Sequence, residues 1–312
     1  MHILFMNKKL NILSLFDGMS TLQLALKNVG IPVNNYYASE IKPYAIKLTQ
    51  HHFPNTIQLG DVTKWKEWDI DWGSIDLIGS GSPCQDLSIA GKRKGITGER
   101  SSLFFVFVDI LNHVRKFNHE VKFLQENVAS ASGKDINIMS KALGTFPQMI
   151  DSKLFVPQSR KRLYWSNIKT CRKGLFSDLY SCFDIPEKRE DIKLNDILIN
   201  AVSNRNFGYA LLERYYNGNK FLNKSDEKSQ IKLMERYEQF KFNLVYDVEK
   251  KINRLLNQTE MERLQGFPDG YTKILTVSQA SSILGDAWTL PVIEMIMEQY
   301  KKVIECTDIS CA

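Results

Sequence analysis

The sequence predicts an α/β protein built on a doubly wound, mostly parallel sheet, with a small irregular lobe attached to it. Short β-rich runs alternate with segments of helical periodicity over roughly the first 168 residues, and glycine or polar residues follow the ends of these runs. Strands that alternate with helices at this spacing are typical of parallel sheets. Because ligands of such sheets bind beyond the carboxyl ends of the strands, we expect the functional residues there.

Two strand–helix pairs open the chain. Residues 11–16 form a short β-rich run, and the apolar residues that follow recur at helical spacing until a glycine stops the helix. Residues 36–39 are a second β-rich run, and residues 44–51 are a second helical pattern. The first strand therefore ends at Asp17, and the second ends at Glu40.

The next elements continue this alternation. Residues 76–80 predict a short buried strand, which a loop containing glycine and proline follows. Residues 103–114 predict a strongly apolar helix, and residues 121–124 predict another strand. A last amphipathic helix is expected after Pro291.

The alternation weakens after about residue 168. Residues 169–250 contain 15 Lys or Arg and 13 Asp or Glu, so the charge of this segment is nearly balanced and shows no basic stripe. We interpret the segment as a separate lobe, although its composition fits an ordinary insertion equally well. We therefore expect one domain to comprise residues 1–168 and 259–312, and a second to comprise residues 169–258.

The overall composition is that of a soluble globular protein, with 43% hydrophobic and 24% charged residues among 312. No apolar run reaches the ~18 residues of a membrane helix. The first residues do not resemble a signal peptide, so we expect a cytoplasmic protein. Five cysteines without a C-x-x-C pair and five histidines without ligand spacing predict neither a disulfide framework nor a metal site. The net charge of +6 is compatible with a nucleic-acid partner but does not establish one.

Three acidic residues follow expected strands. Asp17 and Gly18 lie between the first strand and its helix, where a glycine lets a ligand approach the backbone. Glu40 lies where a dinucleotide-type fold places a ribose-binding carboxylate. Asp61, after a third expected strand, could accept a hydrogen bond from an adenine amino group. Each alone fits a helix cap or an empty turn, but the three in this order suggest an adenosine-containing cofactor.

Cys84 is a candidate nucleophile. It follows a strand within the loop G-S-G-S-P-C-Q-D, where Pro83 fixes the turn and nearby helix ends or bases could favour the thiolate. A small buried hydrophobic residue is the alternative interpretation of a lone cysteine. Residues 88–95 form a cationic, glycine-punctuated loop that suits phosphate, or that is simply solvated.

Two further segments carry charged candidates. Glu126 immediately follows the strand at 121–124 and could share a proton with a substrate, or it could simply cap a helix. Arg160 and Arg162 alternate as on one face of a strand, so both could point at one ligand. A basic surface strand is the alternative for this pair.

Taken together, these motifs resemble the C5-cytosine-specific DNA methyltransferase family of bacteria and phages. The motifs are F-D-G-M-S, S-E-I, G-D-V, G-S-P-C-Q-D-L-S, Q-E-N-V, Q-S-R-K-R-L-Y-W, R-L-Q-G-F-P-D-G-Y and L-G-D-A-W-T-L-P-V, and they cover nearly the whole chain except the middle lobe. The amino-terminal part is also similar to the catalytic domain of animal de novo DNA methyltransferases. The resemblance implies a Rossmann-like, class I S-adenosylmethionine-dependent methyltransferase fold, with residues 169–258 in the place of a target recognition domain.

The resemblance also implies roles for individual residues. Cys84 would attack C6 of a cytosine that has been flipped out of duplex DNA. Glu126 would contact N3 and the exocyclic amine and supply a proton, and Arg162 would bind O2 with support from Arg160. S-adenosylmethionine would be the methyl donor and S-adenosylhomocysteine the product. The residues implied to hold this cofactor are Phe16, Asp17, Gly18, Glu40, Ile41, Asp61, Val62, Pro83, Asp286 and Trp288.

Three positions depart from the family pattern. Ser20 stands where a second glycine is usual, Ser82 where a proline is common, and Asp286 where an asparagine is usual. The implied partner is double-stranded DNA and not a membrane, and we expect a monomer encoded by a bacterium or a phage. The chain would either belong to a restriction–modification system with a cognate restriction endonuclease or act as an orphan enzyme.

Three other functions would fit parts of this sequence pattern. A tRNA cytosine methyltransferase would share the fold, but the tripeptide typical of that branch is not found near the loop at residues 88–95. A catalytically inactive DNA-binding homologue would not need the intact set of Cys84, Glu126 and Arg162. A nucleotide-binding protein that transfers no methyl group is the third alternative.

Overall fold

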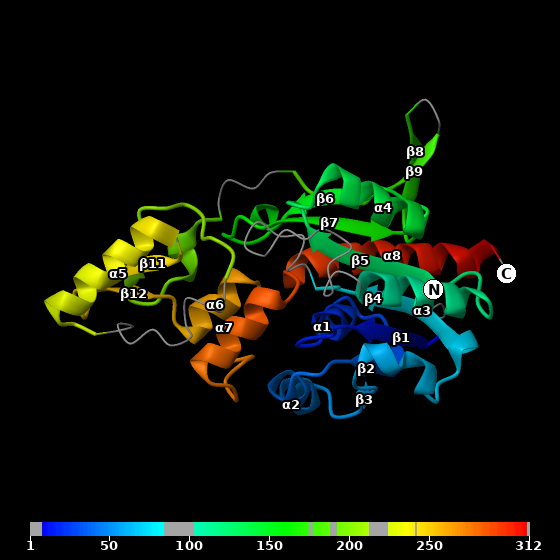
Figure 1. The fold of residues 1–312 in the computed structure, drawn as a ribbon, viewed down its shortest axis with the longest axis horizontal. Coiled ribbons are helices and arrows are strands. Elements are labelled where there is room, and N and C mark those ends of the chain that lie inside the picture. The colour runs from blue at the N-terminus through cyan, green and yellow to red at the C-terminus, as the bar shows by residue number, and fades with distance from the viewer. Residues whose placement is uncertain are drawn as a thin grey trace. The chain divides into compact units, whose positions relative to one another are not determined.

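A computed structural model describes residues 8–83, 103–174, 177–187, 192–211, 224–240 and 242–310. The chain divides into two compact units (Figure 1). The first unit comprises residues 1–150, 161–185 and 292–312, and the second comprises residues 151–160 and 186–291. None of the helices in the described ranges is long and apolar enough to cross a bilayer.

The first unit contains a seven-stranded sheet in the order β3-β2-β1-β4-β5-β7-β6. Its strands are β1 (Leu10–Leu15), β2 (Val33–Ser39), β3 (Ile57–Gln58), β4 (Ile75–Ser80), β5 (Lys122–Val128), β6 (Gln148–Asp151) and β7 (Lys161–Ser166). All neighbouring pairs from β3 to β5 are parallel, and β7 runs antiparallel to β5. Strand order reverses at β1, which pairs with β2 on one side and β4 on the other. The predicted doubly wound, mostly parallel sheet is confirmed.

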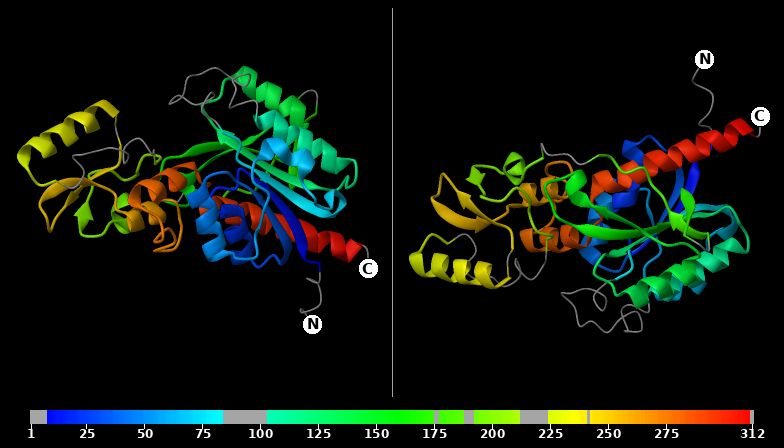
Figure 2. Two further views of the ribbon diagram at one scale, coloured as in Figure 1. Left: turned by 60° about the horizontal axis from the view of Figure 1, so that its bottom comes forward. Right: turned by 90° about the horizontal axis from the view of Figure 1, so that it is seen from above.

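Helices cover both faces of this sheet (Figure 2). The helices of the first unit are α1 (Thr21–Asn28), α2 (Pro43–His52), α3 (Leu103–Arg115), α4 (Gly133–Leu143) and most of α8 (Leu290–Ser310), with short helices η1 (Val62–Glu67) and η2 (Trp72–Ser74). Side chains of α3 and α4 pack with the fully buried Phe123 and Trp165 of the strands on one face. Burying an aromatic side chain of this size contributes about 2–3 kcal/mol. The other face is covered by α1 and α8, which are joined by a hydrogen bond from Asn28 to Glu294 of 2.6 Å.

Local sequence signals explain the helix ends. Ser132 begins α4, because its side chain accepts a hydrogen bond from the Asp135 N–H at 3.1 Å. Gly144 ends the same helix with φ 74°, a left-handed conformation that glycine adopts without strain. Pro43 occupies the first turn of α2, where its missing N–H has no helical partner to lose.

The two compact units divide the chain differently from the predicted domains. The hairpin of β8 (Thr170–Lys173) and β9 (Asp178–Ser181) belongs to the first unit, where the Ser166 N–H donates to the Ser181 hydroxyl at 2.8 Å. Residues 259–291 belong to the second unit. They contain most of α6 (Gln258–Leu264) and all of α7 (Val277–Asp286).

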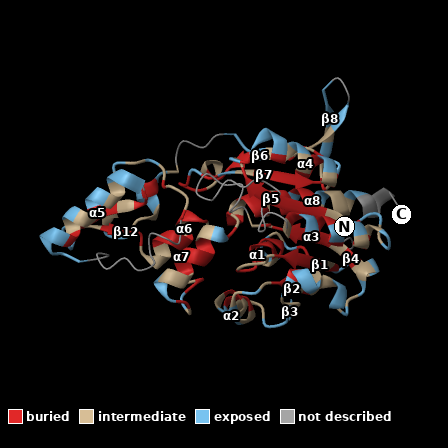
Figure 3. Cartoon of the chain, viewed as in Figure 1, coloured by how far each residue is buried: buried red, intermediate tan, exposed pale blue. Residues whose placement is uncertain are grey.

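The second unit has regular structure where the sequence predicts an irregular lobe. It contains η3 (Ser152–Leu154), η4 (Leu194–Ile197), α5 (Glu227–Phe240), α6, α7 and a sheet of β10 (Ala201–Val202), β11 (Leu244–Asp247) and β12 (Ile252–Leu255). Strands of two to four residues are too short to show a clear alternation in the sequence, which explains the difference. Figure 3 shows that buried residues gather at α6 and α7, whereas much of α5 is exposed.

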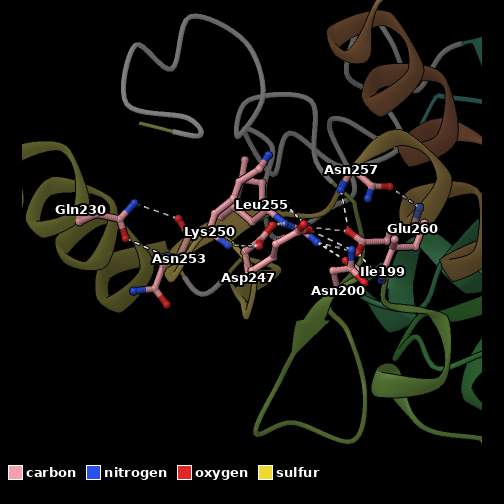
Figure 4. A network of polar contacts seen from close by, with 11 residues as sticks. Ile199, Asn200, Gln230, Asp247, Lys250, Asn253, Leu255, Asn257 and Glu260 are labelled. Carbon is pink, nitrogen blue, oxygen red and sulfur yellow. Dashed lines mark hydrogen bonds and ion pairs between the residues drawn. The ribbon is translucent and has the colours of Figure 1, made fainter. Parts of the chain in front are cut away.

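A buried polar network joins β11, β12 and α6 (Figure 4). The Arg254 guanidinium donates to both carboxylate oxygens of Glu260 at 2.7 and 2.9 Å, and to Asp247 at 2.8 Å. At the outer edge of β12, the Asn253 N–H donates to the Gln230 side-chain oxygen at 2.8 Å, and the Gln230 amide donates back to the Asn253 carbonyl at 3.0 Å. These contacts connect the small sheet to α5 and α6.

Candidate active site

The turn between β1 and α1 has a strained backbone. Phe16, Gly18 and Ser20 have φ values of 56°, 62° and 57°. Glycine adopts this left-handed region readily, whereas Phe and Ser do so only where the surroundings hold them. The Asp17 N–H donates to the Ser39 carbonyl of β2 at 3.1 Å, so part of that hold comes from the neighbouring strand.

The Asp17 side chain points into the protein. The Tyr36 hydroxyl donates to Asp17 Oδ1 at 2.7 Å, and the Ser20 hydroxyl donates to Oδ2. Burial raises the pKa of the Asp17 carboxyl, while the hydrogen bonds from neighbouring hydroxyl groups oppose that rise. Asp17 thus stabilises the turn through its hydrogen bonds with Tyr36 and Ser20. Tyr36 carries no sequence motif, and only its place on a buried strand face could have pointed to it.

Glu40 and Gly18 lie together at the ends of β2 and β1. The Gly18 N–H donates to Glu40 Oε2 at 2.9 Å, and the N–H groups of Ile41 and Lys42 both donate to Oε1 at 2.8 Å. A carboxylate offers about four acceptor positions, so three backbone donors orient Glu40 and still leave a position on Oε2. The Ile41 side chain itself is exposed.

Asp61 lies in the loop after β3 and is exposed. Its Oδ1 accepts hydrogen bonds from the N–H and the hydroxyl of Thr63, both at 2.9 Å, and these bonds lower the pKa of the carboxyl. The next residue, Val62, is buried and begins η1. Asp61 therefore stays ionised while its side chain is held in one orientation.

Glu126 and Arg162 form an ion pair. Their strands are antiparallel, with Val128 opposite Arg162 and Glu126 opposite Tyr164, so the two charged side chains are diagonal neighbours on one face. Arg162 Nε lies 2.8 Å from Glu126 Oε1, and only 8% of Glu126 is exposed. Because β7 is antiparallel, its beginning lies at the same sheet edge as the end of β5. The structure therefore brings these two predicted catalytic residues together.

Arg160 takes a different course from Arg162. Its guanidinium donates to the carbonyl oxygens of Gly285 at 3.0 Å and Ala287 at 2.9 Å, at the end of α7. Strand alternation predicts that both arginines point at one ligand. The structure differs, because Arg160 precedes β7 and is buried within the second unit. Asp286 and Trp288 lie in the segment that Arg160 holds.

The nucleophile loop begins at the end of β4. Ser82 is buried and Pro83 is half-buried, and Cys84 lies outside the described residues, as do residues 88–95. Asp17, Glu40, Ser82 and Glu126 all lie at or near the carboxyl ends of parallel strands. No group of three or more His, Cys, Asp or Glu residues that could hold a metal occurs in the part of the chain that the structure describes.

The sheet order and the residues along its carboxyl edge define a Rossmann-like fold of the S-adenosylmethionine-dependent methyltransferase class. The family model of the C-5 cytosine-specific DNA methylases matches residues 10–302, and the chain belongs to this family.

Among its relatives, the orphan methyltransferase M.SPRI of Bacillus phage SPR is 33% identical over 251 residues, which are 72% of this chain and 54% of the relative. This chain thus spans about half the length of that protein. The Type II methyltransferase M.NlaX of Neisseria lactamica is 25% identical over 319 residues, which cover 94% of this chain and 96% of the relative.

Solved structures share the fold. The methyltransferase EhMeth of Entamoeba histolytica superposes with a TM-score of 0.64 at 16% identity, covering 95% of this chain and 99% of its own. The Dnmt2 methyltransferase of S. pombe superposes with a TM-score of 0.59 at 16% identity, covering 94% of this chain and 99% of its own.

Proposed function

We propose that this protein is a DNA (cytosine-5-)-methyltransferase that transfers a methyl group from S-adenosylmethionine to C5 of a cytosine. The observation that carries the proposal is the Glu126–Arg162 pair of 2.8 Å. It lies at the same sheet edge as Glu40 and as the strand that leads to Cys84. A carboxyl group and a guanidinium held side by side match the ring nitrogen, exocyclic amine and carbonyl that lie along one side of a cytosine.

The chain's own residues account for the activation of the ring. The Cys84 thiolate forms a bond to C6, and the electron pair of the C5–C6 double bond moves toward C5 and the N3–C2 region. Glu126 supplies a proton at N3, and Arg162 stabilises the charge at O2. After C5 has gained the methyl group, C5 loses its proton and N3 returns its proton to Glu126. The C6–S bond then breaks and restores both the ring and the thiolate. This chemistry requires the cytosine to leave the base stack.

The turn after β1 and the acids after β2 and β3 fit an adenosine cofactor. Glu40 keeps an acceptor position toward a ribose hydroxyl, and Asp61 Oδ2 makes no hydrogen bond to the described residues, so it is open to an amino group. Gly18 presents backbone without a side chain at positive φ. When bound, S-adenosylmethionine supplies an electrophilic methyl group on a sulfonium. Phe16, Val62, Pro83 and the segment containing Asp286 and Trp288 would complete its surroundings.

We assign target recognition to the lobe predicted at residues 169–258, and in particular to its part within the second unit. Lys228, Lys232 and Arg236 recur every fourth residue along α5, so they share one side of a helix that is largely exposed. Basic residues on such a surface contact DNA phosphates. Replacing both Lys228 and Arg236 with alanine should lower the magnitude of the slope of log affinity against log salt by about 2, whereas Lys116→Ala in the turn after α3 should leave it unchanged.

Labelled S-adenosylmethionine tests the substrate class. We expect label to be retained by duplex DNA and not by tRNA. Retention by tRNA alone would exclude the proposed substrate, and no retention on DNA of many sequences would favour an inactive homologue. Duplex containing 5-fluorocytosine should trap the wild-type protein covalently but not Cys84→Ser, and trapping of that variant would show that another residue is the nucleophile.

The setting of the enzyme is part of the proposal. Because orphan and Type II methyltransferases both occur among the relatives, the protein works either alone or beside a cognate restriction endonuclease. We infer that it acts as a monomer. Bisulfite sequencing of DNA from expressing cells would identify the methylated site, and sedimentation would test the monomer.

A further inference from the structure

Four polar side chains are buried together at the carboxyl ends of β4 and β5. They are Ser80, Ser82, Gln125 and Asn127, and none is more than 4% exposed. Ser80 and Gln125 are directly opposite each other in the parallel ladder, and Ser82 follows two residues after Ser80. Burying a polar side chain is unfavourable unless it finds a partner, so the hydrogen bonds of this group indicate what it does.

Two amide groups of β5 converge on one hydroxyl group. Gln125 Nε2 donates to Ser82 Oγ at 2.9 Å, and Asn127 Nδ2 donates to the same oxygen at 3.3 Å. Each amide is itself fixed, because Gln125 Nε2 also donates to the Glu126 carbonyl at 2.7 Å and Asn127 Oδ1 accepts from the Val128 N–H at 2.8 Å. Gln125 Oε1 has no hydrogen-bond partner among the described residues, so this amide is oriented by the two acceptors of its nitrogen. Ser82 is the residue that both amides hold. We call this arrangement the Ser82 clasp.

Ser82 lies where the chain leaves β4 toward Cys84. β4 ends at Ser80, and only Gly81 and Ser82 lie between the strand and Pro83, which precedes Cys84. The proline ring fixes the φ torsion of Pro83 and restricts the backbone of Ser82 before it, whereas Gly81 has the freest backbone of any residue type. The direction in which the chain leaves the sheet toward Cys84 is thus set at Ser82. The Ser80 hydroxyl, two residues earlier, has no hydrogen-bond partner among the described residues. Burial at this strand end therefore does not by itself provide a serine with a hydrogen bond.

We propose that Gln125 and Asn127 are positioning residues that act through Ser82 to direct the Cys84 segment toward the base. The inference rests on the proposed function, in which Cys84 is the nucleophile. In this proposal, β5 contributes to the site in two ways. Glu126 faces the base, and the residues on either side of it align the nucleophile's loop. A single strand would therefore couple the position of the acid to that of the thiolate, and small errors in such alignment lower rates strongly.

The test is the rate of covalent trapping by a duplex pool that contains 5-fluorocytosine, measured at saturating duplex and S-adenosylmethionine. Ser82→Ala should slow trapping about tenfold, because it removes the acceptor of two buried hydrogen bonds. Its melting temperature should fall only by the few degrees that the loss of these hydrogen bonds costs, and its affinity for S-adenosylhomocysteine should match that of the wild type. Ser80→Ala is the matched control, two residues away and equally buried, and should trap within about twofold of the wild-type rate.

A double-mutant cycle separates a positioning role from general packing. If Gln125 acts through Ser82, then Gln125→Leu with Ser82→Ala should be no slower than Ser82→Ala alone. The inference is overturned if Ser82→Ala traps at the wild-type rate or if the two effects multiply in full. If Ser82→Ala unfolds, Gln125→Met takes its place with the same expected slowing. A wild-type protein that is not trapped overturns the proposed function as well, whereas equal trapping of wild type and variants overturns the Ser82 clasp alone.

Discussion

Glu260 is the residue at which the second unit can be tested most sharply, by substitution with glutamine. Each oxygen of its carboxylate accepts two hydrogen bonds. Oε1 accepts from Ile199 N–H at 2.8 Å and Arg254 Nη2 at 2.9 Å, and Oε2 accepts from Asn257 N–H at 2.8 Å and Arg254 Nη1 at 2.7 Å. A glutamine keeps one oxygen and turns an amide donor toward the other two donors. The variant thus loses two buried hydrogen bonds and half of the charge that compensates Arg254.

The magnitude follows from these losses. Two buried donors without an acceptor cost about 1–3 kcal/mol each, and breaking a buried ion pair costs about 3–5 kcal/mol in all. Asp247 remains beside Arg254 and limits the loss. We therefore expect Glu260→Gln to destabilise the second unit by about 3–5 kcal/mol. The matched control is Asp269→Asn, which removes the exposed partner of Arg263 at the other end of α6 and should cost less than about 1 kcal/mol.

Hydrogen exchange measures this loss within one unit. Amides of β11 and β12 should lose protection by at least about 100-fold in Glu260→Gln, since a factor of ten corresponds to ~1.4 kcal/mol. Amides of β1 and β4 should be unchanged. Tryptophan fluorescence would not substitute for this assay, because Trp65, Trp68, Trp72 and Trp165 lie in the first unit and only Trp288 lies in the second. Unchanged protection in β11 and β12 would refute the reasoning.

Three other predictions concern the first unit. Tyr36→Phe removes the 2.7 Å hydrogen bond to Asp17 and should weaken S-adenosylhomocysteine binding about 5- to 10-fold by calorimetry, and equal affinity would mean that the turn does not depend on this bond. Glu126→Gln should lower methyl transfer at least about 100-fold because it removes the proton donor, while cofactor affinity stays within about twofold, and a wild-type rate would contradict the role of Glu126. The Cys171 thiol donates a hydrogen bond to Cys182, which raises the pKa of Cys171 and leaves less reactive thiolate at any given pH. Iodoacetamide should therefore modify Cys171 faster in Cys182→Val than in wild type at pH 8, and mass spectrometry showing equal rates would count against the contact.

The elements of the main sheet could be predicted because their signals are local. Residues 11–16 and 36–39 correspond to β1 and β2, and the helical periodicity at 103–114 corresponds to α3. The parallel arrangement followed from the alternation of strands and helices, and it placed Asp17, Glu40 and Glu126 at one edge. In such a sheet, the place of a residue along the chain largely determines the edge at which it lies.

The parts that could not be predicted depend on contacts between distant residues. Nothing near Arg160 in the sequence indicates that its guanidinium binds carbonyl groups at Gly285 and Ala287. The Tyr36–Asp17 bond likewise joins residues whose only shared signal is burial. β10, β11 and β12 are too short for periodicity, and their association depends on the buried charges of Arg254 and Glu260, which a sequence pattern would place on the surface.

The pairing of Gln230 with Asn253 has a consequence for the behaviour of the protein at high concentration. β12 is an outer strand of its small sheet, and an outer strand ordinarily offers free N–H and C=O groups to any extended segment that meets it. Here the Gln230 amide occupies one outward N–H and one outward C=O in the way a neighbouring strand would. A second molecule could add a strand at this place only after α5 had moved away. One glutamine on a helix thereby protects the edge of a four-residue strand against intermolecular β-pairing and aggregation.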